Sequence, residues 1–168
     1  GILELFPVQL VRSTSSRSNG FNSVQEAVLK QPFSAIRADF RKTAYASYWA
    51  ELIYNWIVDN FKQVSLYRLL EHVFTELDRG RTAPAVLNIL FQMRFLTLSG
   101  HRPNLDDCSV CRKALENIKQ NHIIIDSRRG GILCNNCRTG ASSHTWFGKG
   151  TVKQLLWVES GDLAKATR

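Results

Sequence analysis

Residues 108–111 read CSVC and residues 134–137 read CNNC, and these two short segments decide the fold of the C-terminal part of the chain. In each segment two cysteines flank two other residues, and 22 residues lie between the segments. Two such knuckles bring four thiolates to one point, where sulfur ligands at about 2.3 Å complete a tetrahedron around a metal ion. We therefore predict one structural Zn²⁺ without an open coordination position, bound by Cys108, Cys111, Cys134 and Cys137.

The same four cysteines permit other interpretations: unrelated buried thiols, two disulfides, or an iron centre of the rubredoxin type, because iron also accepts four tetrahedral sulfurs. All cysteines of the chain fall within 30 consecutive residues, whereas a secreted disulfide scaffold usually spreads its cysteines to join distant segments. The clustering favours a metal ion and a reducing compartment. We interpret three histidines as surface or packing residues, because the cysteines already complete a ligand set: His101, His122 and His144.

The segment between the knuckles is long enough for a β-hairpin, which makes this part of the chain a zinc ribbon. Residues 122–126 predict a strand and residues 127–131 a turn, after which the chain leads back into the second knuckle. Residues 140–150 are expected to form a loop. Thr151 is expected to cap a final amphipathic helix.

Three helices are expected in the residues before the knuckles, at 32–57, 65–80 and 82–100. Pro32 and Pro84 suit first-turn positions of the first and third helices. Ser65 is a suitable N-cap for the second helix, and Gly80 is suited to end it. The short connections predict antiparallel neighbours in a compact bundle.

The first of these helices is rich in aromatic side chains. At helical spacing such residues belong first of all to a core, although a binding face is the alternative: Tyr45, Tyr48, Trp49, Tyr54 and Trp56. Glu51 in the same helix is expected either to pair with an arginine or to face solvent, since an unpaired buried carboxylate is costly.

Residues 1–30 are predicted to be β-structure, in which Pro7 indicates an edge strand or a bulge. Residues 19–20, Asn-Gly, indicate a turn, and residues 21–29 fit either another strand or a short helix. Two or three strands without a partner sheet are not stable alone. Since the chain also lacks an initiator methionine, we interpret it as a fragment of a longer protein. The fold class is therefore mainly α with small β parts.

The charge of the chain is uneven. Its net charge is +8, but residues 1–107 hold 12 Lys/Arg and 10 Asp/Glu, whereas residues 108–168 hold 10 and 4. This basic C-terminal part predicts an acidic partner, although a Zn²⁺ with four thiolates would offset two of its positive charges. No apolar run approaches the roughly 18 residues that a membrane span needs, and the first residues do not resemble a secretory signal.

Seven cations of the C-terminal part are candidates for contacts with nucleic-acid phosphates: Arg112, Lys113, Arg128, Arg129, Arg138, Lys149 and Lys153. A solvated ribbon surface without a ligand is the alternative. Trp146 and Phe147 are expected either to stack on exposed bases or to pack as a plug between the ribbon and the helices. No phosphate loop, nucleophile elbow or metalloprotease motif is present, so we predict a binding protein and no catalytic residues.

The order of these parts resembles the RecO family of recombination mediators. The most specific matches are residues 91–96 leading to Gly100, residues 103–105 before the first knuckle, and residues 125–134 leading into the second knuckle. In the first helix, Tyr48, Glu51 and Leu52 also match the family pattern. The resemblance covers nearly all of the chain, and it assigns the zinc ligands to the four cysteines.

The resemblance implies the following domains: a remnant of an N-terminal OB-fold at 1–30, a helical bundle at 31–107, a zinc ribbon at 108–139, and a loop with a C-terminal helix packing on the bundle at 140–168. It also implies that the family's last helices are cut short. An OB barrel that lacks strands cannot close, so a contribution of this remnant to DNA binding is not expected.

The function that the resemblance implies is that of a bacterial, cytoplasmic, nucleoid-associated DNA-repair mediator without catalytic activity. Such a protein binds single- and double-stranded DNA, contacts RecR and the tail of single-strand-binding protein, promotes annealing and helps to load RecA. The alternative function is a zinc-ribbon interaction module that binds an acidic peptide or RNA.

Overall fold

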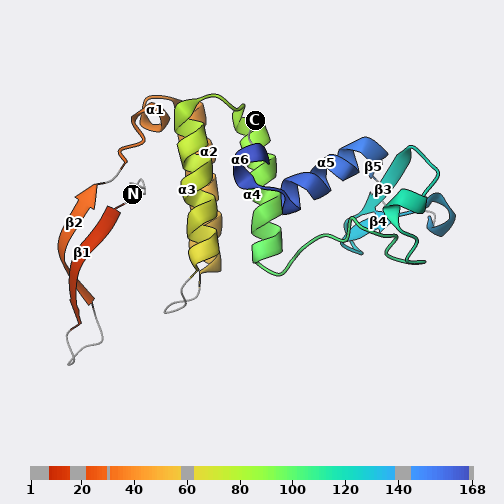
Figure 1. Ribbon diagram of the computed structural model, residues 1–168, viewed down its shortest axis with the longest axis horizontal. Coiled ribbons are helices and arrows are strands. Elements are labelled where there is room, and N and C mark those ends of the chain that lie inside the picture. Colours follow the sequence, from red (N-terminus) through yellow and green to blue (C-terminus); the bar gives the residue numbers. More distant parts are fainter. Residues whose placement is uncertain (1–7, 16–21, 30, 58–62, 139–144, 167–168) are drawn as a thin grey trace.

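The computed structural model describes residues 8–15, 22–29, 31–57, 63–138 and 145–166, and it is mainly helical (Figure 1). A β-hairpin lies at one end, a bundle of helices in the middle, and a small three-stranded ribbon at the other end. Within the described residues, none of the helices combines the length and the hydrophobicity that crossing a bilayer requires.

The N-terminal hairpin confirms the strand alternative for residues 21–29. Strand β1 (Val8–Ser15) pairs antiparallel with β2 (Asn22–Leu29), and the register shifts between Leu10 and Ser13. The hairpin lies away from the helical bundle, beyond helix α1 (Ser34–Arg37) (Figure 1). Pro7 and the Asn-Gly turn at 19–20 lie outside the described residues. That the hairpin is an OB-fold remnant stays a prediction.

The expected continuous helix at 32–57 is wrong, because the chain breaks at Asp39 into α1 and α2 (Phe40–Trp56). Asp39 is extended, and its carboxylate accepts hydrogen bonds from the backbone N–H groups of Arg41 and Lys42. This carboxylate is a good N-cap, so it starts a new helix within an otherwise helical hydrophobic period. Pro32 precedes α1 instead of lying in its first turn.

The other two bundle helices lie close to their expected bounds. Helix α3 (Val64–Arg79) starts one residue before the expected Ser65, and Gly80 ends it in the left-handed conformation, with φ 71°. Helix α4 (Pro84–Leu98) confirms the first-turn position of Pro84. The helices α2, α3 and α4 pack against one another, as expected for a compact bundle.

The bundle core is built around Trp49, which is fully buried in α2. Its indole stacks on Phe91 of α4, and its Nε1–H donates a hydrogen bond of 2.9 Å to Asn88. Of the five aromatic residues expected in the core, Trp49 is buried and Tyr45 is half-buried against the core, whereas the other three are exposed. Glu51 faces solvent.

The ribbon sheet has the order β4-β3-β5 and is antiparallel. Strand β3 (His122–Asp126) has its expected bounds, and β4 (Gly131–Leu133) returns along it. The loop expected at 140–150 is wrong where the structure describes it, because β5 (Thr145–Gly148) pairs with the free edge of β3. Helix α5 (Lys149–Ser160) follows at once, two residues before the expected cap Thr151.

Helix α5 connects the ribbon to the bundle, as Figure 1 shows. Val152 near its start is fully buried in the ribbon core, and Val158 near its end packs against both cores. The short helix α6 (Leu163–Ala166) then packs on the bundle core. The C-terminal helix therefore packs on the ribbon as well as on the bundle.

Candidate metal centre and basic surface

The four cysteines meet at one point. Their Sγ atoms all lie within 4.8 Å of one another, and the Sγ atoms of Cys111 and Cys134 are 3.7 Å apart. Two ligands at about 2.3 Å from a tetrahedral Zn²⁺ are separated by about 3.8 Å, whereas a disulfide requires about 2.05 Å. The cysteines are free thiols, so the disulfide interpretation does not hold. Four sulfur donors at these distances fit a zinc ion.

Local backbone structure places each pair of sulfurs. At the first knuckle the N–H of Cys108 donates to the carbonyl of Lys113, and the N–H of Arg112 donates to the carbonyl of Cys108. This tight turn holds Arg112 in the left-handed conformation, with φ 59°. At the second knuckle, β4 leads into Cys134, and one 3₁₀ turn (Asn135–Cys137) follows. The local backbone turn at each knuckle therefore positions its own pair of thiols.

The site favours a thiolate at Cys108. Burial raises the pKa of this thiol, but hydrogen bonds from the backbone N–H groups of Cys111, Cys134 and Val110 outweigh burial and lower the pKa to about 6. The pKa of Cys137 is raised to about 12, first of all by its hydrogen bond with the side chain of Cys134. A metal ion would displace the remaining thiol protons, because thiolates are the ligands that zinc binds.

Gly131 lets the linker between bundle and ribbon, residues 99–107, lie against β4. The N–H of Asn104 donates to Gly130, and the carbonyl of Asn104 accepts from Ile132, both at 2.9 Å or less. A Cβ at Gly131 would lie 2.6 Å from the carbonyl oxygen of Asn104 and 2.5 Å from the hydroxyl of Ser109. Both groups belong to the segment that carries the first knuckle, so glycine is required at this position.

We expect Gly131→Ala to destabilise the zinc-loaded protein by about 1–3 kcal/mol, because a buried backbone contact must open to admit the methyl group. Gly150→Ala is the matched control, since a Cβ at Gly150 meets nothing within 4 Å. Alanine there should leave stability unchanged or slightly raised. Urea unfolding curves measure both effects, and equal midpoints for wild type and Gly131→Ala would contradict this close approach.

Several of the seven candidate cations have protein partners. The ammonium of Lys149 donates to the carbonyls of Glu116 and Ile118, at 3.0 and 2.7 Å, and so holds the start of α5 to the ribbon. Lys153 pairs with the carboxylate of Glu116 at 3.0 Å. Arg129 lies 3.5 Å from Asp126. These three side chains contribute to the fold of the ribbon, whatever else they contact.

The remaining candidates are exposed. Arg112 is 3.5 Å from Asp107, but its side chain is 73% exposed. Lys113 and Arg128 have no ion-pair partner among the described residues. The backbone of Arg128 is fixed, because its N–H donates to the buried carboxylate of Asp126 at 2.9 Å. These cations extend from an ordered turn and an ordered knuckle into solvent.

Strand β5 places its two neighbouring aromatic side chains, Trp146 and Phe147, in different environments. Phe147 packs against the ribbon core opposite Ile123, as the plug interpretation predicts. Trp146 is 47% exposed, and the guanidinium of Arg138 lies 5.5 Å from the centroid of its ring. Successive side chains of a strand point to opposite faces, so the two neighbours have different environments.

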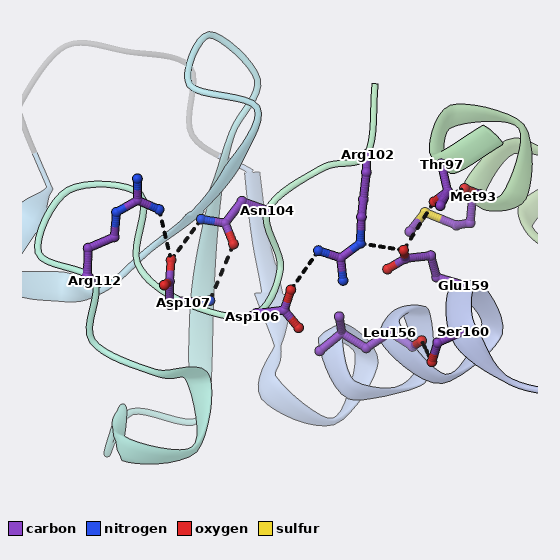
Figure 2. Close-up of polar contacts among 10 residues, drawn as sticks. All are labelled: Met93, Thr97, Arg102, Asn104, Asp106, Asp107, Arg112, Leu156, Glu159 and Ser160. Carbon is purple, nitrogen blue, oxygen red and sulfur yellow. Dashed lines mark hydrogen bonds and ion pairs between the residues drawn. The ribbon is translucent and has the colours of Figure 1, made fainter. Parts of the chain in front are cut away.

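Arg102 joins the ribbon to the helices, although no pattern in the sequence marks it as a functional residue. Its Nε donates to Glu159 of α5 at 2.5 Å, and its Nη1 donates to Asp106 of the linker at 2.7 Å (Figure 2). Glu159 is buried and also accepts a hydrogen bond from Thr97 of α4. These hydrogen bonds raise the pKa of Arg102 above its ordinary value. No sequence motif links positions 57 residues apart.

Comparison with known proteins gives a consistent result. A family model described as "Recombination protein O C terminal" matches residues 37–168. The chain is 41% identical to "DNA repair protein RecO" of Desulfatibacillum aliphaticivorans and 38% identical to "DNA repair protein RecO" of Desulfosudis oleivorans. Each of these two alignments covers 100% of this chain and 66% of the relative, so the chain spans just under two thirds of their length.

Proposed function

The chain belongs to the RecO family, and we propose that it is a non-catalytic DNA-binding part of a recombination and repair mediator. In this proposal, the zinc ribbon provides a basic surface for DNA, and the metal ion maintains the fold of that surface. The proposal rests on the family membership and on the charges of the ribbon.

One observation carries the proposed DNA contact: the ribbon has exposed cations that its carboxylates do not neutralise. Residues 108–138 contain six Lys/Arg and only two Asp/Glu. Of the two carboxylates, that of Asp126 is buried and that of Glu116 pairs with Lys153 of α5. Exposed guanidinium and ammonium groups bind phosphate oxygens and release counterions, whatever the base sequence, and the exposed ion pair of Arg112 with Asp107 would open for such a contact. We assign this role first to Arg112, Lys113, Arg128 and Arg138.

The absence of catalysis is part of the proposal. A metal ion with four cysteine ligands has no open position at which to activate water or polarise a substrate, so its contribution would be structural. The metal would be held by Cys108, Cys111, Cys134 and Cys137, and zinc fits this donor set. The ribbon core is small, and such cores commonly depend on a metal or on disulfides.

The family membership supports the rest of the proposal. We propose that the protein acts in the bacterial cytoplasm, near the nucleoid, that it promotes annealing of single strands, and that it helps to load RecA. Its partners would be RecR and the tail of single-strand-binding protein, together with single- and double-stranded DNA. The helical bundle offers exposed apolar side chains for a protein partner, among them Tyr48 and Trp56 of α2.

A titration with a fluorescent single-stranded oligonucleotide at several salt concentrations tests the proposed DNA contact. We expect tight binding at low salt that weakens steeply as salt rises. In the double variant Lys113→Ala/Arg128→Ala, the slope of log K against log salt should fall by about 1.4, since each lost contact to a single strand removes about 0.7. Arg41→Ala, on the exposed surface of α2, is the control and should not change the slope.

No binding at low salt, by zinc-loaded and folded protein, would contradict DNA binding. That result would favour a zinc-ribbon module that binds an acidic peptide. An unchanged salt slope in the double variant would show that Lys113 and Arg128 do not contact DNA.

A further inference from the structure

We propose that Trp146 and Arg138 form a stacking site for an unpaired base of single-stranded DNA. This inference rests on the proposed DNA binding and adds to it: phosphate contacts alone would bind single strands and duplexes alike, whereas this site would select exposed bases. It also assigns a role to an exposed aromatic side chain of the ribbon that lies beside a cation.

The first argument is the position of the indole. Trp146 is 47% exposed at the centre of a four-residue strand, whereas its neighbour Phe147 packs into the ribbon core. Across the sheet, Trp146 pairs with Ile124, which is buried. The backbone of Trp146 is therefore fixed by the sheet while a large part of its ring faces solvent. An aromatic ring held in this way is a preformed surface for a flat ligand.

The second argument is Arg138, whose guanidinium lies over the indole with its carbon 5.5 Å from the ring centroid. Arg138 follows directly after the second knuckle, and its backbone N–H donates to the carbonyl of Asn135, so the turn that carries Cys137 also positions Arg138. The cation–π contact restricts a side chain that would otherwise be mobile. A planar guanidinium and an indole can each stack on a base, and the guanidinium can also reach a phosphate.

The third argument is the charge around this pair. In the register of β3 and β5, Ile125 pairs with Thr145, so the β3–β4 turn lies at the end of the sheet where β5 begins. That turn carries Arg128, which is exposed. A base on the indole would thus have a cation nearby for the adjoining phosphate. An acidic peptide could use the cations, but it need not supply a planar ring for the indole. A duplex keeps its base faces within the stack.

Two labelled strands of equal length and charge test the site: oligo-dT and the same strand built from abasic deoxyribose units. Both strands make phosphate contacts, but only oligo-dT can stack. We expect wild type to bind oligo-dT more tightly than the abasic strand. Trp146→Ala should weaken binding of oligo-dT about tenfold, as is typical for loss of one stacked base, and leave binding of the abasic strand unchanged. Trp146→Phe should keep part of the preference.

Trp157→Ala is the matched control, because this tryptophan is 50% exposed on α5 and has no part in the proposed site. It should bind both strands as wild type does. Metal content and circular dichroism of each variant show that the ribbon is folded. Arg138→Ala provides a second test, since it should weaken both strands through its charge and should also reduce the preference for oligo-dT.

The possible outcomes separate the two proposals. If folded wild type binds both strands equally, and Trp146→Ala does the same, the stacking site is wrong while phosphate binding stands. If Trp146→Ala weakens both strands by the same factor, stacking is again wrong, because the loss does not depend on bases. If wild type binds neither strand at low salt, the proposed DNA binding fails and the stacking site fails with it.

Discussion

A Cys108→Ser variant should lose stoichiometric metal binding, and residues 108–138 of the ribbon should unfold while the helical bundle stays folded. Cys108 is fully buried, and its sulfur accepts a hydrogen bond from the N–H of Cys134 at 3.4 Å, so the two knuckles meet at this atom. Binding of a structural zinc ion contributes roughly 10–16 kcal/mol to the folding of small zinc domains. The bundle has a core of its own around Trp49.

Metal content per chain and limited proteolysis measure the two parts of this prediction. New cleavage sites should appear within the ribbon and not within α2, α3 or α4. Ser109→Ala in the same knuckle is the control, because the Ser109 hydroxyl is buried and has no hydrogen-bond partner among the described residues. Removing it should preserve metal binding and stability. A Cys108→Ser protein with one bound metal and a protected ribbon would contradict the assignment of this ligand.

The second large effect is expected for Arg102→Met, which should destabilise the protein by about 2–3 kcal/mol. The side chain of Glu159 is only 4% exposed, and its Oε2 already has no hydrogen-bond partner in the described part of the chain (Figure 2). Without Arg102, the buried carboxylate would keep one hydrogen-bond donor among the described residues, the hydroxyl of Thr97, and the charge of Arg94 nearby. We expect less than the roughly 3–5 kcal/mol typical of fully buried pairs, because the side chain of Arg102 is 42% exposed.

Urea unfolding at neutral pH measures this loss. Arg79→Met is the matched control, because Arg79 pairs with Glu76 one turn away on the surface of α3, at 2.7 Å, and such exposed pairs contribute less than about 1 kcal/mol. The double variant Arg102→Met/Glu159→Met should recover part of the stability by removing the buried charge. If Arg102→Met unfolds at the same urea concentration as wild type, the contact between linker and α5 does not stabilise the fold.

The local features of this chain were predictable because their causes are local. The C-x₂-C spacing alone brings two thiols together, and the four sulfurs cluster as predicted. Strand β3 follows from a short apolar run that ends at the turn residues 127–131. Gly80 ends α3 because glycine adopts the left-handed conformation without strain.

The features that the sequence did not predict depend on contacts between distant residues, or on a single side chain that interrupts an otherwise regular pattern. Strand β5 forms because β3 offers a free edge, which a pattern of four residues does not indicate. The break before α2 arises because the single carboxylate of Asp39 caps a new helix. Arg102 and Glu159 meet only when α5 lies across α4. The hydrogen bonds of Lys149 to two backbone carbonyls and the ion pair of Lys153 likewise depend on how α5 docks on the ribbon.

If the zinc ribbon carries the DNA contact, removal of the metal should weaken DNA binding. Binding of a single-stranded oligonucleotide at low salt is measured on zinc-loaded protein, on the same protein after removal of the metal, and after zinc is returned. We predict that affinity falls when the metal is removed and returns with zinc, while the helical bundle stays folded throughout. Metal-free protein that binds with unchanged affinity and salt dependence would contradict a metal-dependent DNA contact.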